Sequence, residues 1–212
     1  MLTIKLGFAL EGNSDYPVIP NLTRRVIQSY APDTVFLPES TLRPRKRGHG
    51  FVQELHTFAR QLQDDKVDMI VAVVDTDNTR VNERGRLIQE AQQRCMSNGI
   101  ATCIAAGLAV HALEAWLLAD ELALFNVFDG DRQAVQFPSV ELELSPKAAI
   151  NRIVQELTHG QEVSFVPFAA DLVENIRLQI LRQRCPHFDD FARNVTNCFR
   201  HLERIQNQPP AG

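Results

Sequence analysis

Short apolar runs alternate with amphipathic segments along the first half of the chain. Continuous apolar runs are typical of parallel strands that are buried on both faces. Segments in which apolar residues recur every three or four positions are typical of helices packed on such a sheet. We therefore expect an α/β fold, a parallel sheet flanked by helices. The expected strands are residues 3–10, 34–37, 69–74 and 100–105.

Helical periodicity dominates the rest of the chain and fills its second half. Ser145 followed by Pro146 is typical of a helix start, with serine at the N-cap and proline at the first helical position. The expected helices are residues 16–30, 51–62, 82–97, 109–124, 147–157, 169–181 and 188–205. We expect an α/β domain over residues 1–125, a helical C-terminal extension packed on it over 126–205, and a tail over 206–212.

Composition is ordinary for a globular protein. The 212 residues are 44% hydrophobic and 23% charged, and no apolar segment has transmembrane length. The first residues run directly into a strand pattern without the features of a signal peptide. We therefore expect a cytoplasmic protein that does not bind membranes. The four cysteines form no C-x-x-C pair, so we expect reduced, mostly buried thiols and no zinc site.

Carboxylates stand where two expected strands end. Glu11 follows the first apolar run, and Asp75 and Asp77 follow the run that ends at Val74. The carboxyl ends of parallel strands meet at one edge of a sheet, and carboxylates are ligands that Mg²⁺ prefers. We predict that Glu11, Asp75 and Asp77 are catalytic residues that bind Mg²⁺ or Mn²⁺, with Glu11 alternatively acting as a base. The competing explanation is that the two aspartates form a turn or cap the next helix.

Four further residues form a second rank of candidates. Asp15 lies about one turn beyond Glu11, although a helix N-cap explains it equally well. His111 and Glu114 are three positions apart on an expected helix and would share a face, as metal ligands or an acid–base pair. Lys147, in the first turn of its helix, would stabilise charge on a phosphate unless it is an ordinary surface residue.

Glu114 is the stronger of the two candidates on the expected helix 109–124. A carboxylate inside an otherwise apolar helix is costly unless it is paired or bound to a metal. A single histidine on an apolar helix is more often structural, so His111 remains open between the two interpretations. Trp116 is expected in the core.

Basic residues are concentrated in one segment although the net charge is −4. Arginine suits bidentate contacts with phosphate, so this segment and Arg80, near the acidic turn, are candidate nucleic-acid contacts. A solvated loop is the alternative. The cluster consists of Arg43, Arg45, Lys46 and Arg47.

The acidic motifs resemble those of a Toprim domain. Glu11-Gly-Asn-Ser-Asp15 follows the first strand, and Asp75-Thr-Asp77 follows a later one. The resemblance implies a Rossmann-like parallel sheet and acidic residues that bind Mg²⁺ for phosphodiester cleavage or transfer, as in topoisomerases, primases and overcoming-lysogenisation-defect (OLD) nucleases. The chain departs from the family in one respect, because Gly12 is the only glycine in the turn after Glu11. The stretch 111–120 is similar to a bacterial Toprim-like set often found near mobile or defence genes.

Taken together, the motifs and the resemblance predict a Mg²⁺-dependent nuclease or phosphotransfer enzyme acting on nucleic acid, in a defence or mobile-element setting. The resemblance also implies a protein partner, for example an ATPase encoded nearby. One alternative is a non-catalytic sensor or partner subunit that binds nucleotide, nucleic acid or another protein. Another is a hydrolase of a small phosphorylated nucleotide. No P-loop and no G-x-G-x-x-G motif occurs, so nothing indicates dependence on ATP or NAD.

Overall fold

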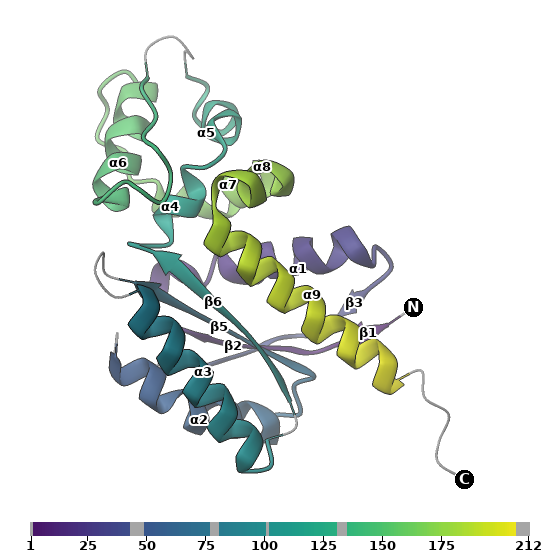
Figure 1. Ribbon diagram of the computed structural model, residues 1–212. Coiled ribbons are helices and arrows are strands. Elements are labelled where there is room, and N and C mark those ends of the chain that lie inside the picture. Colours follow the sequence, from purple (N-terminus) through teal and green to yellow (C-terminus); the bar gives the residue numbers. More distant parts are fainter. Residues whose placement is uncertain (1, 43–48, 77–80, 101, 131–134, 207–212) are drawn as a thin grey trace.

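A computed structural model describes residues 2–42, 49–76, 81–100, 102–130 and 135–206. It has an α/β architecture in which parallel strands are flanked by helices (Figure 1). The strands are β1 (Thr3–Ile4), β2 (Leu6–Leu10), β3 (Val35–Phe36), β4 (Ser40–Leu42), β5 (Met69–Thr76) and β6 (Cys103–Val110). The expected fold class is therefore confirmed.

The helices lie on both faces of the sheet and continue into a helical second half. In chain order they are η1 (Asn13–Asp15), α1 (Ile19–Tyr30), α2 (His49–Asp64), α3 (Val81–Ser97), α4 (Glu114–Leu117), α5 (Glu121–Phe128), α6 (Pro146–Leu157), η2 (Val166–Phe168), α7 (Ala169–Asn175), α8 (Leu178–Arg184) and α9 (Pro186–Gln206). No helix among the described residues is long and apolar enough to cross a membrane.

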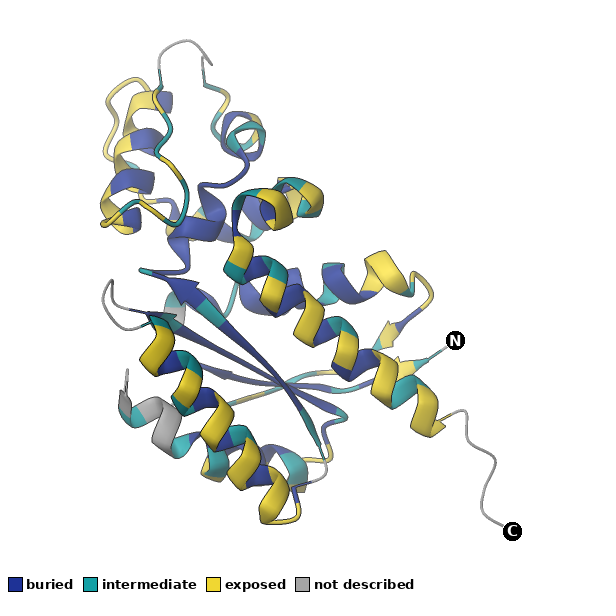
Figure 2. Ribbon diagram, in the orientation of Figure 1, coloured by how far each residue is buried: buried dark blue, intermediate teal, exposed yellow. Residues whose placement is uncertain are grey.

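Among the described residues, the main sheet has the order β4-β2-β5-β6, and all its neighbouring strands are parallel. Alternate residues of its central strands face two different cores. Val71 and Val73 of β5 pack with α1 and α9, whereas Ala72 and Val74 pack with α2 and α3. Figure 2 shows the result, buried strands between helices whose outer faces are exposed. A short parallel pair, β1 and β3, lies beside this sheet.

The expected order of elements is observed, but several boundaries differ. The strand expected over 3–10 is divided at Lys5 between β1 and β2. β4 was not predicted, because its three residues carry no apolar run. The helix expected over 169–181 is two helices, α7 and α8. The break falls at Arg177, which has an extended backbone and donates its N–H to Asp120.

The largest error concerns the end of β6. The strand begins at Cys103 and continues through Val110, where the sequence predicted a helix starting at residue 109. The strand contains three alanines and one glycine. Gly107 allows α9 to approach closely, since a Cβ there would lie 2.7 Å from a ring carbon of Phe191. The single helix expected over 109–124 is instead the end of β6 followed by α4 and α5. Trp116 is fully buried, as expected, and stacks on Phe191 at 5.5 Å between ring centroids.

The expectation of four reduced cysteines is wrong in the structure. Cys103 and Cys198 form a disulfide that joins the start of β6 to α9 across 95 residues of sequence. The absence of a C-x-x-C pattern gave no sign of it, because the two cysteines meet only when α9 packs on the sheet. Cys95 and Cys185 are free and buried, and burial raises the pKa of both thiols.

Candidate functional site

The sheet has a topological switch point between β2 and β5. From β2 the chain runs through α1 to the β4 side of the sheet, and from β5 it runs through α3 to β6 on the other side. α1 and α3 belong to cores on opposite faces. Beyond the carboxyl ends of two such strands, diverging connections leave a crevice, the usual position of binding sites in open α/β sheets. Glu11 immediately follows β2, and Asp75 is near the end of β5.

Asp75 is the most strongly perturbed carboxyl group at this edge. Its side chain is held by a neighbouring loop, since the backbone N–H of Leu113 donates to Asp75 Oδ1 at 3.1 Å. Its pKa is raised to about 8, mainly by burial and also by the charges of Asp15 and Glu114, while Lys147 opposes the shift. In the absence of a cation, Asp75 therefore retains its proton at neutral pH.

Asp15 comes close to Asp75 and closes the turn after β2. Its carboxylate accepts a hydrogen bond from the backbone N–H of Gly12 at 2.7 Å and one from Ser14 Oγ at 3.3 Å. Burial raises the pKa of Asp15 and these two hydrogen bonds oppose that shift, with a smaller upward effect from Glu11. Asp15 lies in η1, so it stabilises this turn rather than capping α1.

Glu114 adds a buried carboxyl group from a third segment. It begins α4 and is only 4% exposed. Lys147 Nζ of α6 lies 3.9 Å from Glu114 Oε1, while Oε2 is buried without a hydrogen-bond partner among the described residues. Burial raises the pKa of Glu114, and Lys147 lowers it by a smaller amount. The helical second half thus contributes a cation to the acidic edge.

His111 does not share a helix face with Glu114, so that prediction is wrong. It lies in the turn between β6 and α4 with a positive φ of 64°. Its backbone N–H donates to Thr76 Oγ1 at 3.3 Å, and its Nδ1 is buried without a partner among the described residues. Thr76, fully buried, was not singled out from the sequence. Its position inside the Asp75-Thr-Asp77 motif was the available signal.

The fold gathers four carboxyl groups and one lysine at this edge. Mutual charge effects on pKa link Glu11, Asp15, Asp75 and Glu114 to one another or to Lys147. We call these five residues the acidic site. Within the ranges that the structure describes, no group of three or more His, Cys, Asp or Glu side chains is close enough to hold one metal ion. The donors suit a hard cation, but they would have to draw together to hold one.

The other predicted residues lie outside the described ranges. These are Asp77, Arg80 and the basic segment Arg43, Arg45, Lys46 and Arg47.

Fold and site together define an α/β protein with an acidic site at the switch point of a parallel sheet. The chain belongs to a family described as a domain of unknown function, DUF4276, whose model matches residues 10–196. The matched range includes every residue of the acidic site and most of α9. Neither the curated proteins nor the solved structures contain a significant match.

Proposed function

We propose that this protein is a Mg²⁺-dependent nuclease or phosphotransfer enzyme that acts on nucleic acid. The observation that carries the proposal is the raised pKa of Asp75 at the switch point of the sheet. Carboxyl groups that are buried beside one another disfavour ionisation, and a divalent cation removes that penalty. Perturbed carboxyl groups of this kind are concentrated at functional sites.

Each residue of the acidic site has a distinct part in the proposal. Glu11 and Asp75, with Asp77, would hold the cation. When bound, it would neutralise charge on the phosphoryl oxygens. Asp15 keeps the turn after β2 closed through Gly12, and so keeps Glu11 at the end of its strand. Glu114 orients Lys147, whose ammonium group can contact a phosphate oxygen.

The setting is part of the same proposal. We infer a cytoplasmic protein that works on nucleic acid, with a protein partner such as an ATPase in a defence or mobile-element system. In a reducing cytosol the Cys103–Cys198 disulfide would be reduced for much of the time.

Metal binding and cleavage must be measured together. Mg²⁺ and Mn²⁺ are titrated by calorimetry into the wild type, Asp75→Asn and Asp77→Asn, and cleavage is assayed on single- and double-stranded DNA and RNA. Asp171→Asn, on the exposed surface of α7, is the matched control. We expect the two site variants to lose metal binding and at least about 100-fold of the cleavage rate, and the control to lose neither.

Two results would contradict the proposal in different ways. Metal binding without cleavage of any of the four substrates would favour a non-catalytic sensor or partner subunit. If the wild type binds neither Mg²⁺ nor Mn²⁺, both the proposed cofactor and the proposed metal-dependent mechanism are wrong.

A further inference from the structure

Helix α3 has a buried stripe that ends in an arginine. The stripe consists of Arg84, Ile88, Ala91 and Cys95, whose spacing of four, three and four residues places them on one face. The last three pack in the core between α3, α2 and the sheet. Arg84 is as buried as they are, at 5% exposed, although guanidinium groups are seldom buried without a partner.

Two donor atoms of the Arg84 guanidinium group have no partner in the part of the chain that the structure describes. Its Nε and Nη1 are buried and have no hydrogen-bond partner among the described residues. Other arginines in the structure are satisfied, for example Arg177 by Asp120 and Arg184 by Glu121. A buried charge without a counter-ion is strongly unfavourable. A guanidinium group in these surroundings is a candidate to bind an anion.

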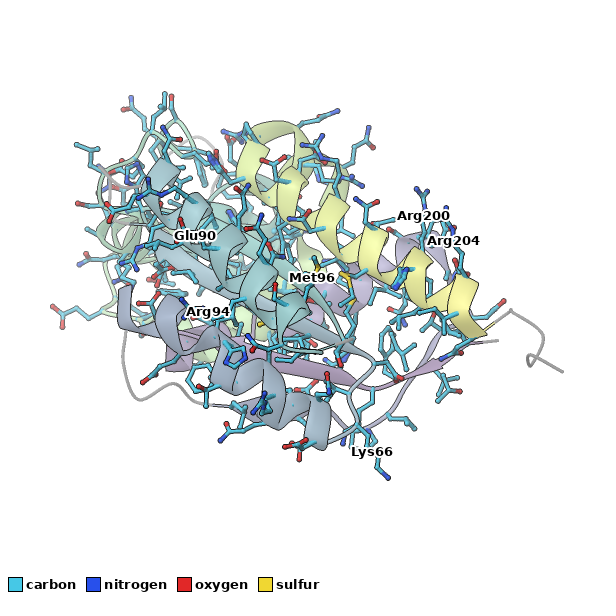
Figure 3. All side chains as sticks on the ribbon, turned by 60° about the horizontal axis from the view of Figure 1, so that its bottom comes forward. Lys66, Glu90, Arg94, Met96, Arg200 and Arg204 are labelled. Atoms are coloured by element: carbon cyan, nitrogen blue, oxygen red, sulfur yellow. A yellow bond between two sulfur atoms is a disulfide. The ribbon has the colours of Figure 1, made fainter. Side chains whose placement is uncertain are left out.

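The position of Arg84 supplies a second set of donors. α3 begins at Val81, so Arg84 is in its first turn, where backbone N–H groups have no partner within the helix. Side chains on a helix tilt toward its N-terminus, which brings the guanidinium group toward those N–H groups. The positive end of the helix dipole also favours an anion there. Arg86, two residues later, is the control position, because it is exposed and pairs with Glu90. Figure 3 labels Glu90, which lies on α3.

We propose that Arg84 and the first turn of α3 bind a phosphate group. A guanidinium group can donate two parallel hydrogen bonds to two oxygens of one phosphate. Carboxylates cannot donate such bonds, so the acidic site does not provide this contact. α3 follows β5 directly, and the six steps from Asp75 to Val81 span at most about 21 Å. The phosphate site is therefore at the same edge of the sheet as the acidic site. The anion site does not depend on the proposed function. The further statement that the bound phosphate belongs to a nucleic-acid backbone does depend on it.

Thermal unfolding in EDTA tests the site without any catalytic readout. The probe is inorganic phosphate, compared with chloride at the same ionic strength. We expect phosphate at about 100 times its Kd to raise the Tm of the wild type by roughly 5–10 °C. Arg84→Met should raise the Tm in chloride, because it removes an uncompensated buried charge, and should abolish the gain from phosphate. Arg86→Met should keep the wild-type gain.

A second variant and a second probe complete the experiment. Arg84→Lys keeps the charge without the fork, so its phosphate gain should be smaller than that of the wild type even if Arg84→Met fails to fold. A short single-stranded DNA oligonucleotide should stabilise the wild type more than Arg84→Met if the phosphate comes from a nucleic-acid backbone. An equal oligonucleotide effect in both would overturn that source and leave a small phosphorylated compound.

The anion site is overturned if Arg84→Met or Arg84→Lys retains the full phosphate gain, or if phosphate does not stabilise the wild type more than chloride does. None of these measurements depends on Mg²⁺. A failure of the proposed function would therefore be seen in the metal titrations and cleavage assays, separately from a failure here.

Discussion

Asp75 is half-buried and Asp120 is fully buried, yet their surroundings shift their pKa values in opposite directions. Burial raises the pKa of Asp75 to about 8, and its neighbours include three other carboxyl groups. Burial alone would also raise the pKa of Asp120, but Arg177 holds it below its ordinary value. Arg177 donates three hydrogen bonds to Asp120, from its backbone N–H at 2.8 Å, from Nε at 2.9 Å and from Nη2 at 2.7 Å.

The opposite pKa shifts distinguish a carboxylate that stabilises the fold, Asp120, from one that is placed to bind a ligand, Asp75. Asp120 is matched to a bidentate partner within the chain and joins the start of α5 to the segment between α7 and α8. Asp75 lies among like charges, and among the described residues Lys147, which is 61% exposed, is the cation that lowers its pKa. Natural folds satisfy most buried charges. A carboxyl group placed among like charges, such as Asp75, or a buried guanidinium group without a partner among the described residues, such as Arg84, therefore indicates where to look for a ligand.

The largest effect on stability should come from breaking the matched pair. Asp120→Ala removes the acceptor of all three hydrogen bonds, and we expect the free energy of unfolding to fall by about 2 kcal/mol, because the partner Arg177 is half-exposed and remains solvated. Chemical denaturation at pH 7 measures this. Glu90→Ala breaks the exposed Arg86–Glu90 pair and should cost about 0.5 kcal/mol or less. Equal losses for the two variants would mean that the Asp120 pair is not buried in solution.

The stability lost in Asp120→Ala should depend on pH, because the Asp120–Arg177 pair requires an ionised Asp120. The pKa of Asp120 is lower in the folded state than in the unfolded state, so its ionised form stabilises the fold. The stabilisation is present above the unfolded pKa of 3.8 and is lost as the pH falls through the folded value. The difference between wild type and Asp120→Ala should therefore shrink in acid.

Asp75 should behave with the opposite sign. Its folded pKa of about 8 exceeds the unfolded value of 3.8, so the folded state retains a proton that the unfolded state releases. The resulting stabilisation is complete below pH 3.8 and is lost as the pH rises toward 8. In EDTA at pH 8, Asp75→Asn should therefore be more stable than the wild type, by about 2 kcal/mol; this is less than the full effect of the shift, because Asp75 is half-buried and water screens its charge.

Unfolding curves of the two proteins between pH 4 and 9 check this prediction. Asparagine is the informative substitution, because its amide oxygen can still accept the hydrogen bond from Leu113. If the wild type and Asp75→Asn change in parallel over that range, the carboxyl group is ionised in the folded state and the comparison with Asp120 fails.

The smallest effect is expected at Lys147. Its cation lowers the pKa of Asp75, so Lys147→Gln should raise that pKa above the wild-type value. Carbon-13 NMR of the Asp75 carboxyl group measures the midpoint. Since Lys147 is largely exposed, the change in the free energy of unfolding should be about 0.5 kcal/mol or less. A lower midpoint in the variant would show that Lys147 does not face the acidic site.

The sequence predicted the sheet better than the crevice, for a physical reason. A strand that is buried on both faces requires a continuous apolar run, such as the one that ends at Val74, so β5 and its neighbours could be recognised from the sequence. Glu11 and Asp75 could be placed at one edge because parallel strands end together. The clustering of carboxylates predicts a raised pKa for one of them, but not that it is Asp75, since its burial and the charges of Asp15 and Glu114 depend on contacts with other segments.

Other features depend on contacts between distant parts of the chain. Ala105 to Val110 is compatible with strand or helix, and its pairing with β5 as far as Val110 makes it a strand. The break between α7 and α8 occurs where Arg177 binds Asp120, 57 residues away. Arg84 was not singled out, although an arginine on an otherwise apolar helical stripe was visible in the sequence.

The disulfide between Cys103 and Cys198 makes most of the second half of the chain a closed covalent ring. A single peptide-bond cut anywhere inside this ring leaves both fragments attached to each other. Limited proteolysis of the helical region would therefore leave a protein of unchanged mass, apart from one added water, until a thiol reagent separates the pieces. Comparing digests with and without such a reagent would reveal both the cut and the ring.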